Sequence, residues 1–233
     1  MPCLLHGRAY DQVRNSICYP KLNVKIAATH AGITVGEDGA THQSLEDISL
    51  MRGIPNMIVF SPSDDVQTKW IIKESCKING PVYIRLTRSA TEQVYEEGQK
   101  FEFGKGVQFG EGTDGSIIAT GITVVEALKA KEKLKEEGID VRVIDIHTIK
   151  PIDKELIIKC AKETKKIITV EDHSIIGGLG SAVCEVLSEE YPSKVTRIGI
   201  KDEFGQSGVW SELMKHYEID CDGIVNRVLK TVF

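Results

Sequence analysis

Apolar and polar positions follow two patterns along the chain, and each pattern predicts a different element. Short runs rich in Val and Ile are typical of buried strands, whereas longer stretches that repeat apolar positions with helical spacing are typical of amphipathic helices. Ser63 or Asp64 is a suitable cap for one of these helices. In the first part of the chain, the patterns predict strands at 24–28, 56–60 and 82–86, and helices at 11–18, 43–52 and 64–77.

The same alternation begins again in the second half of the chain. It predicts strands at 116–120, 140–146 and 166–170, and helices at 124–137 and from Pro151 onward. Residues 89–113 are rich in Glu, Gly, Gln and Lys and have little periodicity, which indicates a linker. We therefore predict an α/β protein with two three-layer α/β/α domains, at 1–88 and 114–233, joined by this linker.

Composition narrows the class of protein. The chain has 233 residues, 41% hydrophobic and 27% charged, which is enough to bury one or two cores of ordinary size. Its net charge of -5 provides no basic field of the kind that favours nucleic-acid binding. No apolar run is long enough to span a membrane or to form a signal-peptide core, so we expect a cytoplasmic protein without a membrane partner. The six cysteines have no C-x-x-C spacing, and no metal site is predicted in this chain.

The fifteen residues from Thr29 to Gln43, T-H-A-G-I-T-V-G-E-D-G-A-T-H-Q, have the composition of a binding site. They contain two histidines, two acids and three glycines, and they lie between a predicted strand and a predicted helix. This position is the carboxyl edge of a sheet, where ligands bind in open α/β folds. Thr41 or Asp38 is placed to cap the following helix, and the glycines let the backbone approach a ligand closely.

The two histidines, His30 and His42, are candidates for proton transfer because imidazole titrates near neutral pH. A single histidine at a strand end is more often a structural residue. Two of them with an acid in one glycine-rich loop favour a site for a polar small molecule.

This stretch, followed by E-D-I-S-L-M-R-G-I-P-N-M, resembles the pyrimidine-binding domain of transketolase, a thiamine diphosphate enzyme that moves two-carbon ketol units between sugar phosphates. The similarity runs from about Gly7 to the C-terminus and looks like the separate C-terminal subunit of a split transketolase. The resemblance implies that His30 and His42 contact the sugar near its carbonyl and help to move protons. It also implies that Asp38 contacts the hydroxyl next to that carbonyl.

A second part of the resemblance concerns the strand P-V-Y-I-R-L-T-R, which ends in a basic residue. The family places an arginine at the position of Arg88 on the substrate phosphate. A guanidinium suits this task because its planar fork donates two parallel hydrogen bonds to phosphate oxygens. Arg85 points to the opposite face by strand alternation, and we expect it to be structural.

The motif that holds the diphosphate and its metal in this family, G-D-G followed by an asparagine, does not occur in the chain. The resemblance therefore implies thiamine diphosphate and Mg bound with the help of a partner, the N-terminal subunit of transketolase, and a homodimer of this chain. The family also has a ring-protonating glutamate and stacking aromatic residues before the position of Gly7. Residues 1–6 do not look like that sequence, so we expect the chain to start inside the domain with an incomplete cofactor half-site, and we assign no cofactor-binding residue.

The segment E-D-H at 171–173, followed by G-G-L-G at 177–180, resembles the C-terminal domain of transketolase-like enzymes. The glycines would let a helix start tight against the sheet. A phosphate or dinucleotide loop is the alternative, although the G-x-G-x-x-G spacing is absent. Glu171, Asp172 and His173 are either site residues or, as we favour, a strand-end cap and domain contact.

We predict the C-terminal part of a transketolase of the pentose phosphate pathway, acting on sugar phosphates. Two alternatives stay open. One is a related enzyme, either deoxyxylulose phosphate synthase or the β subunit of a 2-oxoacid dehydrogenase. The other is a non-catalytic chain that folds, dimerises or binds a partner without turnover.

Overall fold

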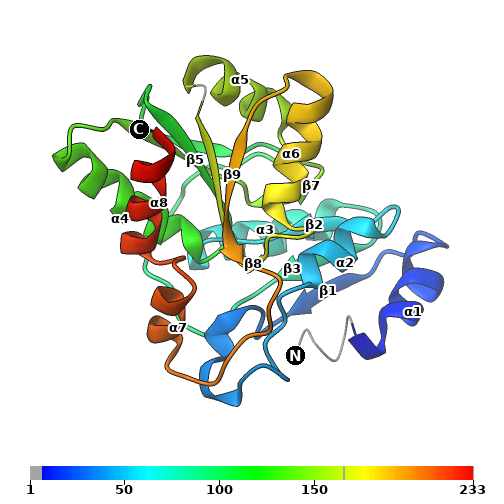
Figure 1. Ribbon diagram of the computed structural model, residues 1–233. Coiled ribbons are helices and arrows are strands. Elements are labelled where there is room, and N and C mark those ends of the chain that lie inside the picture. The colour runs from blue at the N-terminus through cyan, green and yellow to red at the C-terminus, as the bar shows by residue number, and fades with distance from the viewer. Residues whose placement is uncertain (1–6, 165, 233) are drawn as a thin grey trace.

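A computed structural model describes residues 7–164 and 166–232 and contains two sheets covered by helices (Figure 1). Residues 1–6, where the sequence predicts an incomplete half-site, lie outside the described residues. The first sheet has the strand order β1 (Lys25–Ala28), β3 (Val82–Arg85), β2 (Ile58–Phe60), β7 (Thr148–Lys150). The second has the order β4 (Val107–Phe109), β6 (Val141–Asp145), β5 (Gly115–Ala119), β8 (Ile167–Ser174), β9 (Val195–Ile200).

Helices follow the strands in each half of the chain. The first half contains α1 (Tyr10–Gln12), which continues into the π-helix η2 (Val13–Cys18), then the 3-10 helix η3 (Ile33–Asp38), α2 (Asp47–Gly53) and α3 (Asp65–Lys77). The second half contains α4 (Thr123–Glu136), α5 (Lys154–Thr164), α6 (Leu179–Glu190), α7 (Trp210–His216) and α8 (Cys221–Val232). In Figure 1, α4 and α8 lie on one side of the second sheet, and α5 and α6 lie on the other. The predicted α/β fold is confirmed.

Parallel pairing dominates both sheets, with one antiparallel strand at an edge of each. The parallel pairs are β1 with β3, β2 with β3, β5 with β6, β5 with β8, and β8 with β9. The antiparallel strand β4 pairs with β6 and lies inside the interval 89–113, which the sequence analysis predicts to be a linker. The antiparallel strand β7 leaves the second half of the chain and pairs with β2. The chain thus crosses between the two sheets more than once.

The start of α3 agrees with the sequence prediction, whereas the start of α2 does not. Asp64 caps α3 and accepts a hydrogen bond from the Gln67 N–H at 2.8 Å. The helix predicted from Gln43 begins at Asp47 instead, and Glu46 precedes it without a side-chain cap, so neither Thr41 nor Asp38 caps α2.

Longer-range hydrogen bonds explain this difference. The Gln43 Nε2 donates to the carbonyls of Gly36 and Gln206, and the Ser44 carbonyl accepts from the Gly32 N–H. Ala31 and Ser44 also form a parallel bridge. Residues before Asp47 are therefore used to close the preceding loop and do not enter the helix.

Two large apolar cores cross the sequence-based division into halves. One core joins Met51, Val59 and Tyr83 to Ile146 and Ile149. The other lies in the second half of the fold and includes Ile33 and Leu45 from the first half; both are buried. The segment with site-like composition is therefore partly packed into the core of the other domain. Within the described ranges, no helix is long and apolar enough to cross a membrane.

Candidate functional site

Residues 29–43, here called the site loop, lie at the carboxyl end of β1, beside the segment that follows β3. The Ala31 N–H donates to the Leu86 carbonyl at 3.0 Å, and the Arg88 N–H donates to Thr34 Oγ1 at 3.2 Å. Because β1 and β3 are parallel neighbours, their ends meet at one edge of the first sheet. The site loop thus occupies the edge at which the sequence predicts ligand binding.

Asp38 and Arg88, two predicted substrate-binding residues, lie together at this edge. An Arg88 Nη1 lies 3.6 Å from an Asp38 Oδ2, and the same Nη1 donates to the carbonyl of Val35. The two side chains are 42% and 48% exposed, so both are available to a molecule from solvent. The Arg88 guanidinium thereby connects the site loop to the end of β3 and still has part of its surface exposed to solvent.

His30 and His42 stand near the two ends of the site loop, and both are partly buried. In each of them, Nδ1 lies 3.0 Å from the hydroxyl of the preceding threonine, Thr29 or Thr41. Within the described part of the chain, no hydrogen bond reaches the Nε2 of either ring. Each histidine thus has one ring nitrogen beside the hydroxyl of its neighbour and the other without a partner among the described residues, an arrangement that is compatible with proton transfer.

The Glu171–Ser174 segment at the carboxyl end of β8, here called the β8 edge, binds the first domain through two buried side chains. Asp172 Oδ1 accepts a hydrogen bond from the Ile33 N–H at 3.0 Å, which is the first residue of η3. His173 Nε2 accepts one from the Ser49 N–H of α2 at 3.4 Å. Asp172 and His173 are therefore domain contacts, the role that the sequence analysis favours.

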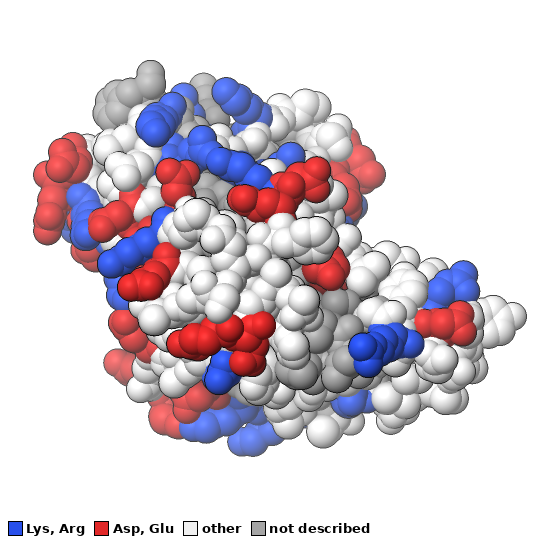
Figure 2. Space-filling view, turned by 60° about the horizontal axis from the view of Figure 1, so that its bottom comes forward, with Lys and Arg blue, Asp and Glu red and all other residues white. Residues whose placement is uncertain are grey.

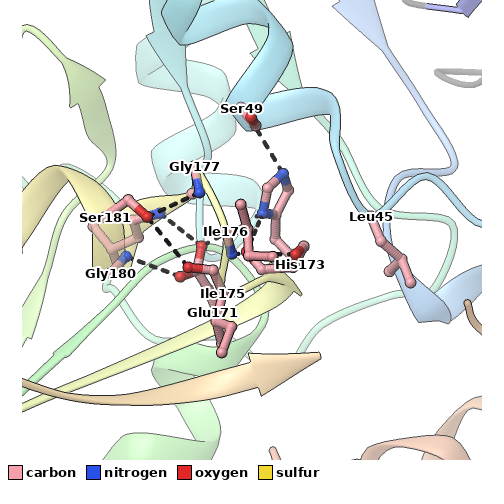
Figure 3. Close-up of polar contacts among 12 residues, drawn as sticks. Leu45, Ser49, Glu171, His173, Ile175, Ile176, Gly177, Gly180 and Ser181 are labelled. Atoms are coloured by element: carbon pink, nitrogen blue, oxygen red, sulfur yellow. Dashed lines mark hydrogen bonds and ion pairs between the residues drawn. The ribbon is translucent and has the colours of Figure 1, made fainter. Parts of the chain in front are cut away.

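Glu171, the first residue of E-D-H, caps α6 (Figure 3). Its Oε2 accepts from the Leu179 N–H at 2.6 Å, and its Oε1 accepts from the Gly180 N–H at 2.8 Å. A Cβ on Gly178 would lie 1.9 Å from Glu171 Oε2, so glycine is needed for the helix to start this close to the sheet. A carboxylate of the protein thus fills the start of α6, which argues against the phosphate-loop alternative.

Burial changes the protonation of the β8 edge. It raises the pKa of Glu171 to about 7 and that of Asp172 to about 6, and it lowers the pKa of His173 to about 4. His173 is therefore neutral at pH 7, and its 3.7 Å approach to Glu171 is not an ion pair. Its Nδ1 lies 2.6 Å from the Ser174 carbonyl and carries the proton, which leaves Nε2 as the acceptor for Ser49.

A buried ion pair connects the β8 edge to the first sheet. Arg85 Nε donates to both carboxylate oxygens of Asp47, at 3.1 and 3.0 Å, and the Tyr83 hydroxyl donates to Asp47 Oδ2 at 2.7 Å. An Nη2 of Arg85 donates to the Asp172 carbonyl at 2.7 Å. Arg85 is structural, as predicted from strand alternation.

The segment before α7 makes contacts with the site loop that sequence reasoning missed. The Ser207 hydroxyl donates to the Glu37 carbonyl at 2.7 Å, and Gln206 accepts from the Gln43 side chain at 2.8 Å. A Cβ on Gly36 would lie 3.3 Å from the Gly208 carbonyl. In the sequence, only the glycines at 205 and 208 indicate a close backbone contact here, and they do not show which segment makes that contact.

Two cavities are lined by sequence neighbours of the predicted site residues, although neither is lined by His30, His42, Asp38 or Arg88 themselves. The larger has a volume of about 530 Å³ and lies between the chain after β3 and the start of α3. The other, of about 480 Å³, lies between Thr41 and Gln43 on one side and Asp202 to Phe204 on the other. Lys and Arg are interspersed with Asp and Glu on the face in Figure 2, without an extended field of one sign. The described residues contain no group of three or more His, Cys, Asp or Glu that could hold a metal ion.

Comparisons with known proteins agree on one family for the two halves of the chain. Residues 4–93 match the model of the transketolase pyrimidine-binding domain, and residues 104–224 match that of the transketolase C-terminal domain. A transketolase C-terminal section from Methanocaldococcus jannaschii is 53% identical over 227 residues, which cover 96% of this chain and 71% of that protein. A 6-deoxy-6-sulfo-D-fructose transketolase subunit from Clostridium sp. (strain MSTE9) is 41% identical, with 94% and 68% covered.

A solved structure described as a split gene transketolase, inactive beta4 tetramer, is 49% identical and has a TM-score of 0.93, covering 100% of this chain and 74% of that one. A 1-deoxy-D-xylulose-5-phosphate synthase from Syntrophus aciditrophicus is 39% identical over 95% of this chain, which spans only 34% of that enzyme. With both domain models matched in sequence order and the whole chain superimposed on a relative, the chain belongs to the transketolase family.

Proposed function

We propose that the chain is the C-terminal part of a transketolase and transfers a two-carbon ketol unit between sugar phosphates together with a partner chain. One observation carries the proposal. Asp38 and Arg88, which are far apart in the sequence, lie 3.6 Å apart at the edge of the sheet where the site loop presents His30 and His42. At this edge, Asp38 can accept a hydrogen bond from a hydroxyl of a sugar phosphate, and Arg88 can donate hydrogen bonds to its phosphate.

The proposed roles follow from these contacts. His30 and His42 contact the sugar near its carbonyl and use the open Nε2 to move protons at the carbonyl and hydroxyl oxygens. Asp38 accepts a hydrogen bond from the hydroxyl next to the carbonyl. Arg88 binds the substrate phosphate, which replaces the carboxylate of Asp38 as the stronger partner of its guanidinium fork.

Thiamine diphosphate would supply the carbanion chemistry of ketol transfer. The described residues do not fit its metal, because they form no cluster of three or more suitable side chains, and the G-D-G motif is absent from the sequence. We therefore assign Mg and the diphosphate to an N-terminal transketolase chain. The names of the relatives as a C-terminal section and as a split gene transketolase support such a partner. The tetramer in the second name supports self-association, and we propose a homodimer of this chain at the centre of the complex.

A deoxyxylulose phosphate synthase is the second candidate, favoured by the 39% identity to such an enzyme. The transketolase proposal has stronger support, because the more similar relatives are a transketolase section and a transketolase subunit.

The decisive experiment mixes the chain with the N-terminal transketolase chain, thiamine diphosphate and Mg, and follows ketol transfer from xylulose 5-phosphate to ribose 5-phosphate. We expect turnover only when both chains are present. A parallel reaction with pyruvate and glyceraldehyde 3-phosphate tests the synthase. Turnover with pyruvate and glyceraldehyde 3-phosphate, but not with the two sugar phosphates, would replace the transketolase proposal by the synthase. If the two chains form a complex that turns over neither substrate pair, the non-catalytic alternative is favoured.

A further inference from the structure

We propose that Asp172 is a positioning residue, through which the second domain fixes the conformation of the site loop carried by the first domain. This inference rests on the proposed function, because the loop is the part of the chain to which we assign proton transfer. Asp172 does not contact the substrate in this account. It acts through the backbone of the loop.

The first observation is the hydrogen bond to Ile33. Backbone N–H groups at the start of a helix lack an intrahelical acceptor, so another group must satisfy them when they are buried. The Ile33 N–H starts η3 and is satisfied by Asp172 Oδ1 at 3.0 Å, from a residue 139 positions away. η3 is kinked at Gly36, which has a φ of +73°, and ends at Asp38. This acceptor therefore sets the start of the segment that carries a proposed substrate contact.

The second observation is the close fit between Asp172 and Gly32. Gly32 has a φ of +74°, and a Cβ built on it would lie 1.8 Å from Asp172 Oδ2. The carboxylate therefore lies directly over the backbone of the residue that precedes η3. One oxygen binds the loop and the other occupies the space of a missing side chain, so the loop and Asp172 fit each other closely.

The third observation is that Asp172 itself has little freedom to move. Its carbonyl accepts from Arg85 Nη2 at 2.7 Å, and Arg85 is paired with Asp47 inside the protein. Ile33, inside the loop, and Leu45, just after it, pack into the core of the second domain. The position of the site loop is consequently fixed by contacts with the second domain as well as by contacts with its own sheet.

A purely stabilising role would not require this carboxylate. Asp172 is 2% exposed, its Oδ2 has no hydrogen-bond partner among the described residues, and burial raises its pKa to about 6. A buried carboxylate with an unsatisfied oxygen costs stability. Its contribution is therefore found in where it places the loop.

The test compares Asp172→Ala, which removes the acceptor, with Asp172→Asn, which keeps an oxygen for Ile33. The matched control is Asp153→Ala. Asp153 is also a buried carboxylate of the second domain that accepts backbone N–H groups, from Leu156 at 3.2 Å and Gly106 at 3.1 Å, but it has no hydrogen bond to the site loop. Loss of stability alone would affect Asp172→Ala and Asp153→Ala alike.

The first readout is amide hydrogen exchange of the complete chain without a partner. We expect the Ile33 amide to exchange at least about tenfold faster in Asp172→Ala, near the wild-type rate in Asp172→Asn, and at the wild-type rate in Asp153→Ala under conditions where all variants are folded. Unchanged exchange in Asp172→Ala would overturn the proposal. If Asp172→Ala does not fold, an unprotected Ile33 amide in the wild type would overturn it.

The second readout is ketol transfer with the N-terminal chain present. We expect kcat to fall at least about tenfold in Asp172→Ala, to recover in Asp172→Asn, and to stay at the wild-type value in Asp153→Ala. An equal fall in Asp153→Ala, or no recovery in Asp172→Asn, would refute a positioning role in the reaction. A wild-type complex without turnover would instead refute the proposed function, and the exchange rates would then decide whether Asp172 orders the loop.

Discussion

The site loop and the β8 edge contain the same residue types, histidine and carboxylic acids, but burial gives them opposite tasks. Asp38 is 48% exposed and lies beside a partly exposed Arg88, whereas Asp172 and His173 are buried and accept hydrogen bonds from the backbone of other segments. A buried side chain that accepts hydrogen bonds from the protein backbone is not available to a ligand from solvent. The comparison shows that residue type nominates a site, and that exposure and existing partners decide whether it binds a substrate or positions the groups that do.

The two regions also differ in the hydrogen bonding of their histidine rings. Burial lowers the pKa of His173 to about 4, so its ring stays neutral at pH 7 and serves as a fixed acceptor for the Ser49 N–H. In the site loop, Nε2 of His30 and His42 has no partner among the described residues. We therefore propose His30 and His42, and not His173, for general acid–base work.

The largest effect expected from this division is on turnover. Replacing His42 by alanine removes a proposed proton-transfer group, and we predict that kcat of the reconstituted enzyme falls by about 10²- to 10⁴-fold, while affinity for thiamine diphosphate changes little. His216→Ala is the control, because His216 is exposed on α7 and its ring lies beside Gln206. Steady-state kinetics would remove His42 from the mechanism if both variants kept wild-type turnover.

The next effect concerns the fit between the regions. Gly32→Ala places a methyl group in the space of the Asp172 carboxylate at a positive φ, and we predict a loss of about 2–4 kcal/mol in the free energy of unfolding. Gly138 has a similar φ of +79° with no atom within 4 Å of a built Cβ, so Gly138→Ala should cost only about 1 kcal/mol. If urea denaturation gives equal losses of unfolding free energy for the two variants, the Asp172 carboxylate does not restrict the side chain that residue 32 can carry.

A pH-dependent effect separates Asp172 from an ordinary exposed acid. Its pKa is raised to about 6 from 3.8 by burial, so the folded state binds its proton more tightly than the unfolded state. The stabilisation of the folded state by the protonated Asp172 is fully present below about pH 4 and is lost as pH rises to about 6. Relative to Asp172→Asn, the wild type should lose on the order of 2–3 kcal/mol of unfolding free energy over this window.

The measurement is urea denaturation of both proteins between pH 4 and 7. Other groups titrate in the same range, among them Glu171, Asp145 and His147, but they are common to both proteins and their contributions cancel in the difference. A difference that does not change with pH would show that Asp172 titrates like a solvated carboxyl.

The smallest effect is expected at Arg88, which is 42% exposed and already shares its charge with Asp38. Arg88→Met should raise KM for phosphorylated donor sugars by about tenfold, equivalent to about 1.4 kcal/mol, and leave KM for an unphosphorylated ketose unchanged. Kinetics with the two donor types provide the internal control. The same loss for both would place Arg88 in the general structure of the loop and not on the phosphate.

The fold was largely predictable because its central strands are short Val- and Ile-rich runs, such as 82–86 and 116–120, which lie close to the observed β3 and β5. Other features were not predicted, among them β7, β9, α7, α8, the start of α2 and the strand β4. The start of α2 moved to Asp47 because Gln43 and Ser44 are held by residues that only the fold brings near. The strand β4 inside 89–113 has three residues, too few for a periodic signal.

The site divides in the same way. The composition of residues 29–43 is sufficient to nominate His30 and His42, and the family resemblance adds Asp38 and Arg88. The role of Asp172 requires knowing that its carboxylate meets the Ile33 N–H, and nothing in the local sequence of either residue points to the other. Chemistry that lies on one loop is visible in sequence, whereas the contacts that place the loop are not.

A double-mutant cycle on kcat tests most directly whether the two regions act as one unit. Ketol transfer would be measured for the wild type, His42→Ala, Asp172→Ala and the double variant, each reconstituted with the N-terminal chain. If Asp172 acts by placing the loop that carries His42, the double variant should lose clearly less than the product of the two single losses. Two losses that multiply in full would show that Asp172 and the site loop contribute independently, and would contradict the account.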